Sequence, residues 1–276
     1  MTQRHREYFK SAMHELERQK IILSAVQEKP VATVAELVAL TDSSEATIRR
    51  DIAAMHMNKQ LIRVRGGAEA LLPPTHSSLA GRPFSVNQSM HVAEKRAIAR
   101  EAVALCKDGD DIIINGGTST YQMVHLLTTM RMQIFTNSFP IAEHLLQHSK
   151  NQLTLPGGTL YREQNIILSP FENDVTRNFC ASRMFMGVHS VGRLGLMESD
   201  PLVIQSEQKL LGQADELVVL ADASKFKRRS SLLICSLDRI DVLITDDRIE
   251  DASVNMLEAA DVKVIIAENK SAANTG

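Results

Sequence analysis

The sequence predicts two domains: a small α+β domain of three helices and a two-stranded wing, then a larger α/β domain on a mostly parallel sheet. The chain has 276 residues, more than one average domain holds. Helix-period patterns fill its first part, whereas short β-branched runs alternate with helical stretches from residue 93 onward. Between them, residues 71–92 contain a Pro pair, a Ser pair and the triplet Gly81-Arg82-Pro83, and they show no sustained periodicity. We therefore expect domains at 13–70 and 93–268, joined by a linker at 71–92.

Three helices are expected in the first domain. The first covers residues 13–28. The second follows Thr33, which together with Glu36 has the spacing of a capping box. The third follows Ser44, a residue type that favours the N-cap position. Apolar residues recur at helical spacing in the first and third helices: Leu16, Leu23 and Val26, then Ile48, Ile52 and Met55.

The third helix carries residue types that a DNA-reading helix uses. Short polar side chains at its start and arginines one turn later could contact bases or phosphates. These residues are Ser44, Glu45, Thr47, Arg49 and Arg50. Asp51 would repel phosphate, so we expect it to form a salt bridge with one of the arginines or with the first helix. The alternative is an ordinary helix whose arginines face solvent, and spacing and charge alone do not decide between the two.

A basic β-wing is expected over residues 61–67. Alternation places Ile62 and Val64 on one side and Arg63 and Arg65 on the other, where the arginines could contact phosphates or the minor groove. An ordinary surface hairpin is the alternative, although the two glycines at 66–67 favour a tight turn or a close approach to a neighbour. Charge agrees weakly with nucleic-acid binding, because residues 1–67 carry 11 Lys and Arg against 8 Asp and Glu, and the remainder carries 20 against 25.

The segments at 36–37, 47–52 and 61–68 together resemble the winged helix-turn-helix of the DeoR family of bacterial transcriptional regulators. The resemblance places the helix-turn-helix at about residues 32–51, with a recognition helix that begins near Ser44. It implies that the partner is double-stranded operator DNA. Family members usually begin close to residues 17–19, so the resemblance implies that residues 1–12 are extra, and the choice between Met1 and Met13 as the start is left open.

Seven strands and a helix at 94–106 are expected in the second domain. The strands are expected at 111–115, 134–136, 153–155, 184–188, 217–220, 242–245 and 262–266. A glycine turn rich in hydroxyls follows the first of them, and such a turn at a helix start suits a phosphate. It matches neither of the common nucleotide-binding glycine motifs. The alternative is a strand-to-helix turn without a ligand. The residues of the turn are Asn115, Gly116, Gly117, Thr118, Ser119 and Thr120.

Further polar residues follow other predicted strands, and strand carboxyl ends border the binding crevice of an open α/β sheet. They are Thr136, Asn137, Gly157, Gly158, Asp222 and Lys225. Lys225 could neutralise a phosphate or polarise a sugar carbonyl, and Asp222 could accept a sugar hydroxyl or orient Lys225. The alternative is a capped turn with a surface lysine.

These stretches resemble the DeoR effector domain, so that the resemblance covers residues 15–267. It implies a fold similar to ribose-5-phosphate isomerase and a phosphorylated sugar as effector. Two stretches depart from the usual family pattern, Asn115-Gly116 and residues 206–209. Together with residues 168–170, they are most similar to the ascorbate-utilisation repressor branch of the family.

Other chemistry is not expected. His144 and His148 share a helix face, but no third metal ligand is apparent, so we expect neither a metal nor a cofactor. The three cysteines are expected to be core thiols. No apolar run is long enough to span a membrane and no signal-peptide block follows the N-terminus, so we expect a cytoplasmic protein.

The sequence therefore predicts a non-enzymatic regulator that acts as a homo-oligomer. We expect a repressor of a carbohydrate-utilisation operon, relieved by a phosphorylated sugar or sugar acid, although activation is left open. The alternative is a sugar-phosphate isomerase-like enzyme with a DNA-binding appendage, in which Lys225 and Asp222 serve as acid and base. A purely architectural DNA protein would leave the glycine turn unexplained.

Overall fold

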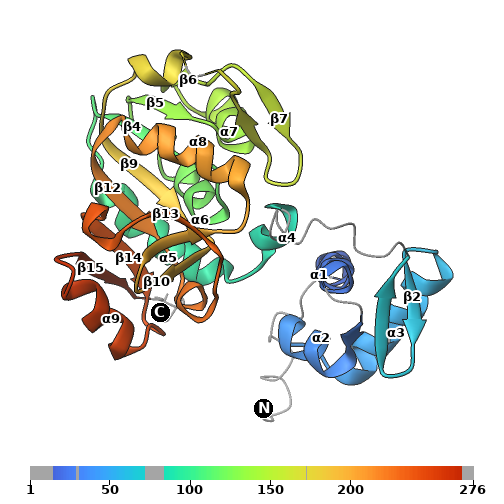
Figure 1. The fold of residues 1–276 in the computed structure, drawn as a ribbon. Helices are drawn as coiled ribbons and strands as arrows, with labels where there is room; N and C mark the ends of the chain where they lie inside the picture. Colours follow the sequence, from blue (N-terminus) through green and yellow to red (C-terminus); the bar gives the residue numbers. More distant parts are fainter. Residues whose placement is uncertain (1–14, 29–30, 72–83, 172, 269–276) are drawn as a thin grey trace, which may run out of the picture. The chain divides into compact units, whose positions relative to one another are not determined.

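The computed structural model describes residues 15–28, 31–71, 84–171 and 173–268. The chain divides into two compact units, residues 1–89 and residues 90–276. Each unit is described by itself below (Figure 1). Of the linker expected at 71–92, residues 72–83 lie outside the described part, and the helix α4 (Phe84–Ser89) packs against α1 within the first unit.

The first unit consists of helices packed on a small antiparallel sheet. The helices are α1 (Glu15–Glu28), α2 (Val34–Thr41) and α3 (Glu45–Met57). The strands lie in the order β1 (Ala32–Thr33), β3 (Gly67–Ala70) and β2 (Leu61–Val64). Ile22, Leu37, Ile48, Met55 and Leu61 are fully buried in its core. The wing is therefore part of a three-stranded sheet, because the chain just before α2 pairs with it.

The predicted start of the second helix is confirmed, and the predicted buried face of the first helix is wrong in part. Thr33 accepts a hydrogen bond from the Glu36 backbone, and Glu36 accepts one from the Thr33 backbone. Leu16, in contrast, is 65% exposed, whereas Val26 of the predicted stripe is buried and Ile22 is buried beside it. Arg18 also lies on that buried face. Because a charged residue is not expected there, the apolar pattern alone predicts the orientation of the helix wrongly in part.

A seven-stranded sheet forms the centre of the second unit. Its order is β15 (Lys263–Ala267), β14 (Val242–Asp246), β12 (Ala214–Leu220), β9 (Ala181–Gly187), β4 (Asp111–Ile114), β5 (Gln133–Thr136) and β6 (Gln152–Thr154). Every neighbouring pair is parallel. All seven expected strands are present, and the sheet is wholly rather than mostly parallel. The carboxyl ends of all seven strands therefore lie at one edge.

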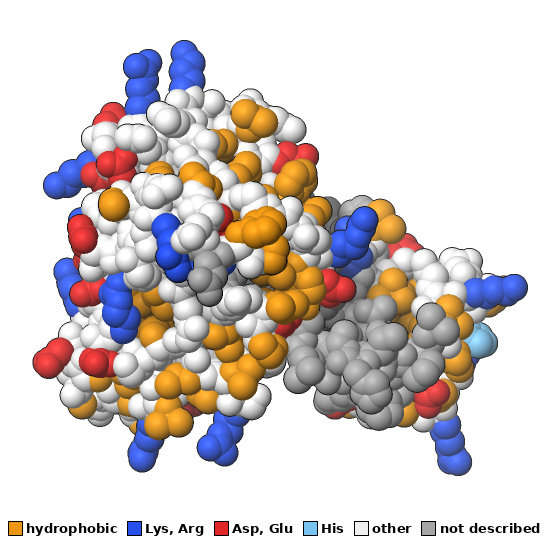
Figure 2. All heavy atoms as spheres, turned by 45° about the horizontal axis from the view of Figure 1, so that its top comes forward, with side chains coloured by type: hydrophobic (Ala, Val, Ile, Leu, Met, Phe, Trp, Pro, Cys, Tyr) orange, Lys and Arg blue, Asp and Glu red, His pale blue; other side chains and the backbone are white. Residues whose placement is uncertain are grey.

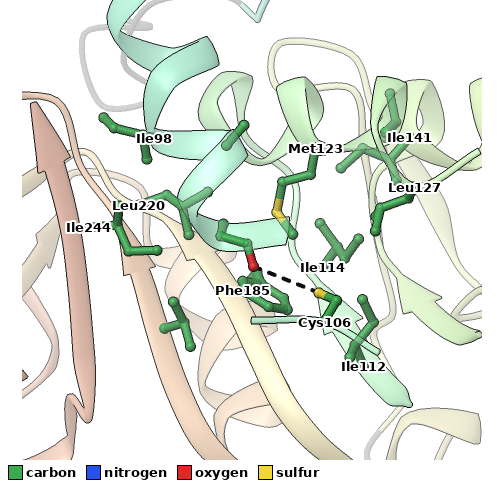
Figure 3. Close-up of a cluster of buried hydrophobic side chains, with 14 of the residues drawn as sticks. Ile98, Cys106, Ile112, Ile114, Met123, Leu127, Ile141, Phe185, Leu220 and Ile244 are labelled. Atoms are coloured by element: carbon green, nitrogen blue, oxygen red, sulfur yellow. Dashed lines mark hydrogen bonds between the residues drawn. The ribbon is translucent and has the colours of Figure 1, made fainter. Parts of the chain in front are cut away.

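Apolar side chains cover both faces of this sheet. On one face, α5 (Val92–Ala104), η3 (Gln122–His125) and α7 (Phe139–His148) pack on a cluster that contains Ile112, Ile114 and Phe185 (Figure 3). On the other face, α8 (Pro201–Leu211) and α9 (Asp251–Glu258) pack on a cluster that contains Met184 and Met186. The two methionines are fully buried, so they serve as core packing residues.

Two small antiparallel sheets were not expected from the sequence. One is the hairpin β7 (Thr159–Tyr161) and β8 (Ile166–Leu168). The other has the order β10 (Ser190–Gly192), β11 (Gly195–Glu198) and β13 (Leu232–Cys235), and it contributes Val191, Leu196 and Ile234 to the second cluster. Short helical turns complete the unit: α6 (Thr118–Tyr121), η4 (Val175–Asn178), η5 (Ala223–Lys227) and η6 (Leu237–Arg239).

The cysteines do not all lie in the core. Cys106 is buried and donates to the Ala102 carbonyl, Cys235 is half-buried, and Cys180 is exposed, so the expectation of three core thiols is wrong for Cys180. Burial raises the pKa of Cys106 to about 12 and that of Cys235 to about 11. Across the described residues, no helix combines the length and the apolar character that a membrane span requires.

Candidate functional site

The start of α3 is a capped, exposed helix end. Ser44 is the N-cap residue, and its hydroxyl accepts the Thr47 backbone N–H at 3.2 Å and lies 2.8 Å from the Thr47 hydroxyl. Ser44 is exposed and Thr47 is half-exposed. Both hydroxyls therefore hold the helix start in shape at the position where the recognition helix was expected to begin.

The two arginines of α3 have different surroundings. Arg49 pairs with Glu45 one turn earlier, with Nε at 2.9 Å and Nη2 at 2.5 Å from Oε1. Both side chains of this pair are more than half exposed. Arg50 is also exposed, and it forms no hydrogen bond or ion pair within the described part of the chain. Arg50 can therefore meet an external phosphate or base directly, whereas Arg49 must first exchange its bond to Glu45.

Asp51 ties the third helix to the first, as one of the two expected arrangements predicted. Its carboxylate accepts hydrogen bonds from Nε and Nη2 of Arg18 on α1, the second at 3.1 Å. Asp51 is 4% exposed and Arg18 is 9% exposed. Because the hydrogen bond to Asp51 outweighs burial, the pKa of Arg18 is raised. Asp51 thus faces the interior, away from any ligand of the exposed arginines.

The wing exposes both of its arginines. Arg63 and Arg65 are exposed. The buried residue of β2 is Leu61, whereas Ile62 is exposed and Val64 is half-buried. The turn between β2 and β3 uses Gly66 at φ 84°. On the face drawn in Figure 2, Lys and Arg side chains project singly and form no continuous basic patch.

Gly67 permits the close approach that the paired glycines suggested. A Cβ atom there would lie 2.1 Å from the carbonyl oxygen of Ala32. Gly67 pairs with Thr33 across β1 and β3, so this approach is what joins the wing to the strand before α2. The wing is therefore fixed to the helical part through backbone contact.

The second unit brings the polar strand ends to one edge of the sheet. β4 lies between β9 and β5, so the turn at 115–117 is flanked by Gly187 on one side and by Thr136 and Asn137 on the other. The turn leads into α6, whose first N–H groups have no partner within the helix. Thr120 is fully buried, and its hydroxyl donates to the carbonyls of Asn115 and Gly117 at 2.9 and 3.0 Å.

Two buried asparagines connect this turn to α8. Asn115 accepts the Gly187 N–H at 2.9 Å and donates to Glu207 Oε1 at 3.1 Å. Asn137 accepts the Gly116 N–H at 2.8 Å and donates to the Ser206 hydroxyl at 3.2 Å. Neighbouring residues of one helix thus hold the ends of two neighbouring strands. These bonds give the asparagines a positioning role for the glycine turn.

A cationic group lies at the same edge, around Lys95, a residue that was not among those expected from the sequence. Lys95 is 2% exposed, and burial lowers its pKa to about 7, with further lowering by Lys225 and Arg228 and opposition from Asp222. The signal in the sequence is that Lys95 lies on the apolar stripe of its helix with Ile98, Ala99 and Ala102. A lysine among the buried apolar residues of a helix is unusual, and it indicates that the side chain has a specific role in a site.

Asp222 is fully buried beside these cations. It caps the turn η5, where it accepts the Ser224 N–H at 3.1 Å and the Ser224 hydroxyl. Burial opposes its ionisation, but Lys225, Ser224 and His91 outweigh burial and lower the pKa of Asp222. The capped turn that was weighed as an alternative is therefore present, and Lys225 beside it is half-buried rather than fully exposed. The group combines a carboxylate with several cations, which suits an anionic ligand that also carries hydroxyls.

Two acids, Glu207, which is buried, and Glu198, which is half-buried, lie near the same edge. Glu207 is 4% exposed, and burial followed by the neighbouring Glu198 raises its pKa well above the usual value. Burial likewise raises the pKa of Glu198. The hydroxyl of Tyr161 on β7 donates to Asp200, the N-cap residue of α8, at 2.6 Å. The hairpin and α8 are therefore connected next to the strand ends.

Gly157 and Gly158 lie at the entry to β7 and are exposed. A Cβ atom on Gly158 would lie 2.2 Å from the carbonyl oxygen of Leu168, so pairing of the hairpin accounts for this glycine. Within the described ranges, no group of three or more His, Cys, Asp or Glu side chains could hold a metal ion.

Comparisons with known proteins place both units. A family model described as the DeoR-like helix-turn-helix domain matches residues 18–72, and one described as the DeoR C terminal sensor domain matches residues 90–247. The chain is 31% identical over 253 residues to the HTH-type transcriptional regulator UlaR of Shigella dysenteriae serotype 1, covering 92% of this chain and 99% of the relative. UlaR of Escherichia coli K12 / DH10B matches with the same identity and coverage.

Solved structures show more distant likeness. Ribose 5-phosphate isomerase A from Methanocaldococcus jannaschii is 20% identical, with a TM-score of 0.35 over 48% of this chain and 53% of the isomerase. The translation initiation factor eIF-2B from Pyrococcus horikoshii OT3 is 14% identical, with a TM-score of 0.38 over 83% of this chain and 79% of that chain.

Proposed function

Because the chain belongs to the DeoR family of transcriptional regulators, we propose that it represses a carbohydrate-utilisation operon and that a phosphorylated sugar or sugar acid relieves this repression. Its helix-turn-helix domain implies DNA as a partner, and its sensor domain implies a small-molecule effector. We assign DNA binding to residues 13–70 and effector binding to 93–268, joined by 71–92. It would act in the cytoplasm, together with the DNA.

The recognition helix α3 would read DNA through its exposed side. Arg50 would contact a base or a phosphate directly, and Arg49 would do so after leaving Glu45. Ser44 and Thr47 would lie close to the DNA backbone at the helix start, and the wing would add phosphate contacts through Arg63 and Arg65. We further propose that the chain is a homo-oligomer, because helix-turn-helix units bind symmetric half-sites in pairs.

The observation that carries the effector proposal is the group of charges at the strand ends. Lys95 and Lys225 would neutralise the effector phosphate next to the turn at 116–119, since a buried amine gains most from an anionic partner. Asp222 would accept a sugar hydroxyl. Asn115 and Asn137 would hold the turn in the shape that receives the phosphate.

DNA binding by the full chain tests both parts. The measurement is fluorescence anisotropy on promoter DNA from the gene's own neighbourhood, with and without ribose 5-phosphate, glucose 6-phosphate and 6-phosphogluconate. Arg50→Ala should weaken DNA binding by about tenfold or more, because one base contact accounts for about 1–3 kcal/mol. Lys225→Gln should bind DNA normally and lose the response to the effector.

Two results would overturn the proposal. If Arg50→Ala binds DNA as tightly as the wild type, the recognition helix is wrongly assigned. If no phosphorylated sugar or sugar acid changes DNA affinity, the effector class is wrong.

An enzyme is the rival function, and the lowered pKa of Lys95 is the observation that favours it, because a lysine that titrates near neutral pH can transfer protons. Isomerisation of ribose 5-phosphate by the purified protein, lost in Lys95→Met, would support the rival. Binding of the same compound without turnover would support the regulator.

A further inference from the structure

A cavity lies outside the strand-end site, against the face of α5 that is turned away from the sheet. Its volume is about 310 Å³, and its lining residues are Arg96, Arg100, Gln122, His125 and Leu126, from α5, η3 and the residue after η3. This volume is at the lower end of the range for small-molecule sites. Lys95, the neighbour of Arg96, is buried and lies about 100° around the same helix from it, and the residues that line the cavity include none of the strand-end residues. The cavity is therefore separate from the effector site.

The wall formed by α5 carries two positive charges. Arg96 and Arg100 are one turn apart, both are exposed, and neither forms an ion pair or hydrogen bond with any residue that the structure describes. Like charges at this spacing repel each other and destabilise a helix. An anion between the two guanidinium groups would remove this repulsion, and guanidinium groups bind carboxylate and phosphate through paired hydrogen bonds.

The wall formed by η3 carries the amide of a largely buried residue. Gln122 is only 6% exposed, and its side-chain amide makes no hydrogen bond within the described part of the chain. Because the amide lines the cavity and has no protein partner there among the described residues, it is available to hydrogen bond to a ligand. The amide lines the same cavity as the two arginines, so it is an observation independent of their charge.

The remaining wall is aromatic and uncharged. The ring of His125 lies 5.6 Å from that of Tyr121 and 4.7 Å from that of His144, and His144 lies 4.7 Å from His148. Burial, and next to it the charge of Arg96, lowers the pKa of His125. The positive charge of the cavity therefore comes from the arginines, while the imidazole and Leu126 offer contact to a less polar part of a ligand.

We propose that this cavity is a second ligand site, which binds a small molecule through a carboxylate or phosphate group held by Arg96 and Arg100, with the Gln122 amide as a further hydrogen-bonding partner. The site does not depend on the proposed function, because none of its residues belongs to the strand-end group. Its occupant is small, since the cavity holds about 310 Å³.

Histidine NMR signals of the full chain provide the test, because His125 is part of the cavity wall. The Lys225→Gln variant serves as background, so that anion binding at the strand ends is weakened. The probes are inorganic phosphate in one series and succinate in the other, which separates the two kinds of anionic group. The His125 signal, assigned with His125→Gln, should shift with saturation for at least one probe.

Three variants make the result specific. Arg96→Gln/Arg100→Gln should weaken binding of the active probe by about tenfold or more, the loss expected when a charge-assisted hydrogen bond is removed. Arg193→Gln/Lys263→Gln removes two exposed charges elsewhere and should leave binding unchanged. Gln122→Leu should weaken binding several-fold without lowering the melting temperature, because it removes an amide that has no partner in the free protein.

The proposal fails if the arginine variant binds both probes as the wild type does. It also fails if the His125 shift stays linear at every concentration, which would indicate non-specific binding only. Unchanged binding in Gln122→Leu would exclude the amide from the site.

Discussion

Replacing Asp51 by alanine leaves the guanidinium of Arg18 inside the first unit without its carboxylate. The two side chains are 6% and 11% exposed, so water cannot replace the lost hydrogen bonds. Loss of one partner of such a buried pair costs about 3–5 kcal/mol. A single core in a domain of this size rarely supplies more than about 3–5 kcal/mol of stability. We therefore expect the first unit of Asp51→Ala to be largely unfolded and DNA binding to be lost, while the second unit keeps its fold.

Hydrogen exchange followed by mass spectrometry measures this effect in each unit separately. Peptides from α1 and α3 should exchange near the unfolded rate in Asp51→Ala, and peptides from β9 and β12 should exchange as in the wild type. Two controls set the scale. Arg18→Leu/Asp51→Leu removes both charges and should regain most of the protection. Glu45→Ala breaks an exposed pair and should cost less than about 1 kcal/mol.

The reasoning is refuted if α1 and α3 of Asp51→Ala stay within about 1 kcal/mol of wild-type protection. That result would mean that the apolar contacts of the two helices suffice without the ion pair.

The remaining predictions concern charge and backbone. Since burial lowers the pKa of Lys95 from 10.5 to about 7, the unfolded chain holds more protons between these values, and the free energy of unfolding should rise with pH across this window. Urea denaturation should show a smaller rise in Lys95→Met, and an equal rise would assign the effect to another group. Removing Arg63 and Arg65 should reduce the slope of log K for DNA against log salt by about 1.8 if both contact phosphate, and an unchanged slope would exclude these contacts. Gly67→Ala should separate β1 from β3, because the added Cβ would meet the carbonyl oxygen of Ala32. Exchange protection in both strands should then be lost, whereas intact protection would show that the backbone adapts.

The central sheet could be predicted from the sequence because its strands are buried on both faces. Runs such as 112–114 and 217–220 are apolar throughout, and a continuous apolar run between helical stretches is typical of a parallel strand. The hairpin of β7 and β8 lacks this signal. Its strands have three residues each, and Leu160 is 43% exposed, so neither length nor alternation marks it.

Those parts of the candidate sites that consist of contiguous sequence motifs were predicted. Those parts that the fold assembles from distant residues were missed. The start of α3 and the glycine turn at 115–120 are contiguous motifs. Lys95 is distant in sequence from Asp222 and Lys225, and only the parallel sheet and α5 bring it near them. The buried face of α1 was predicted wrongly in part for a similar reason. Arg18 lies on that face, and its partner Asp51 is 33 residues away in the sequence.

The pair of adjacent side chains at 206 and 207 has a mechanical consequence. Each of them is hydrogen bonded to an asparagine at the end of a different strand, so a rigid displacement of α8 would strain both bonds at once. The same asparagine side chains accept the N–H groups of Gly187 and Gly116, so the strain would reach these two glycines. We therefore expect the carboxyl ends of β4 and β5 to move together with α8.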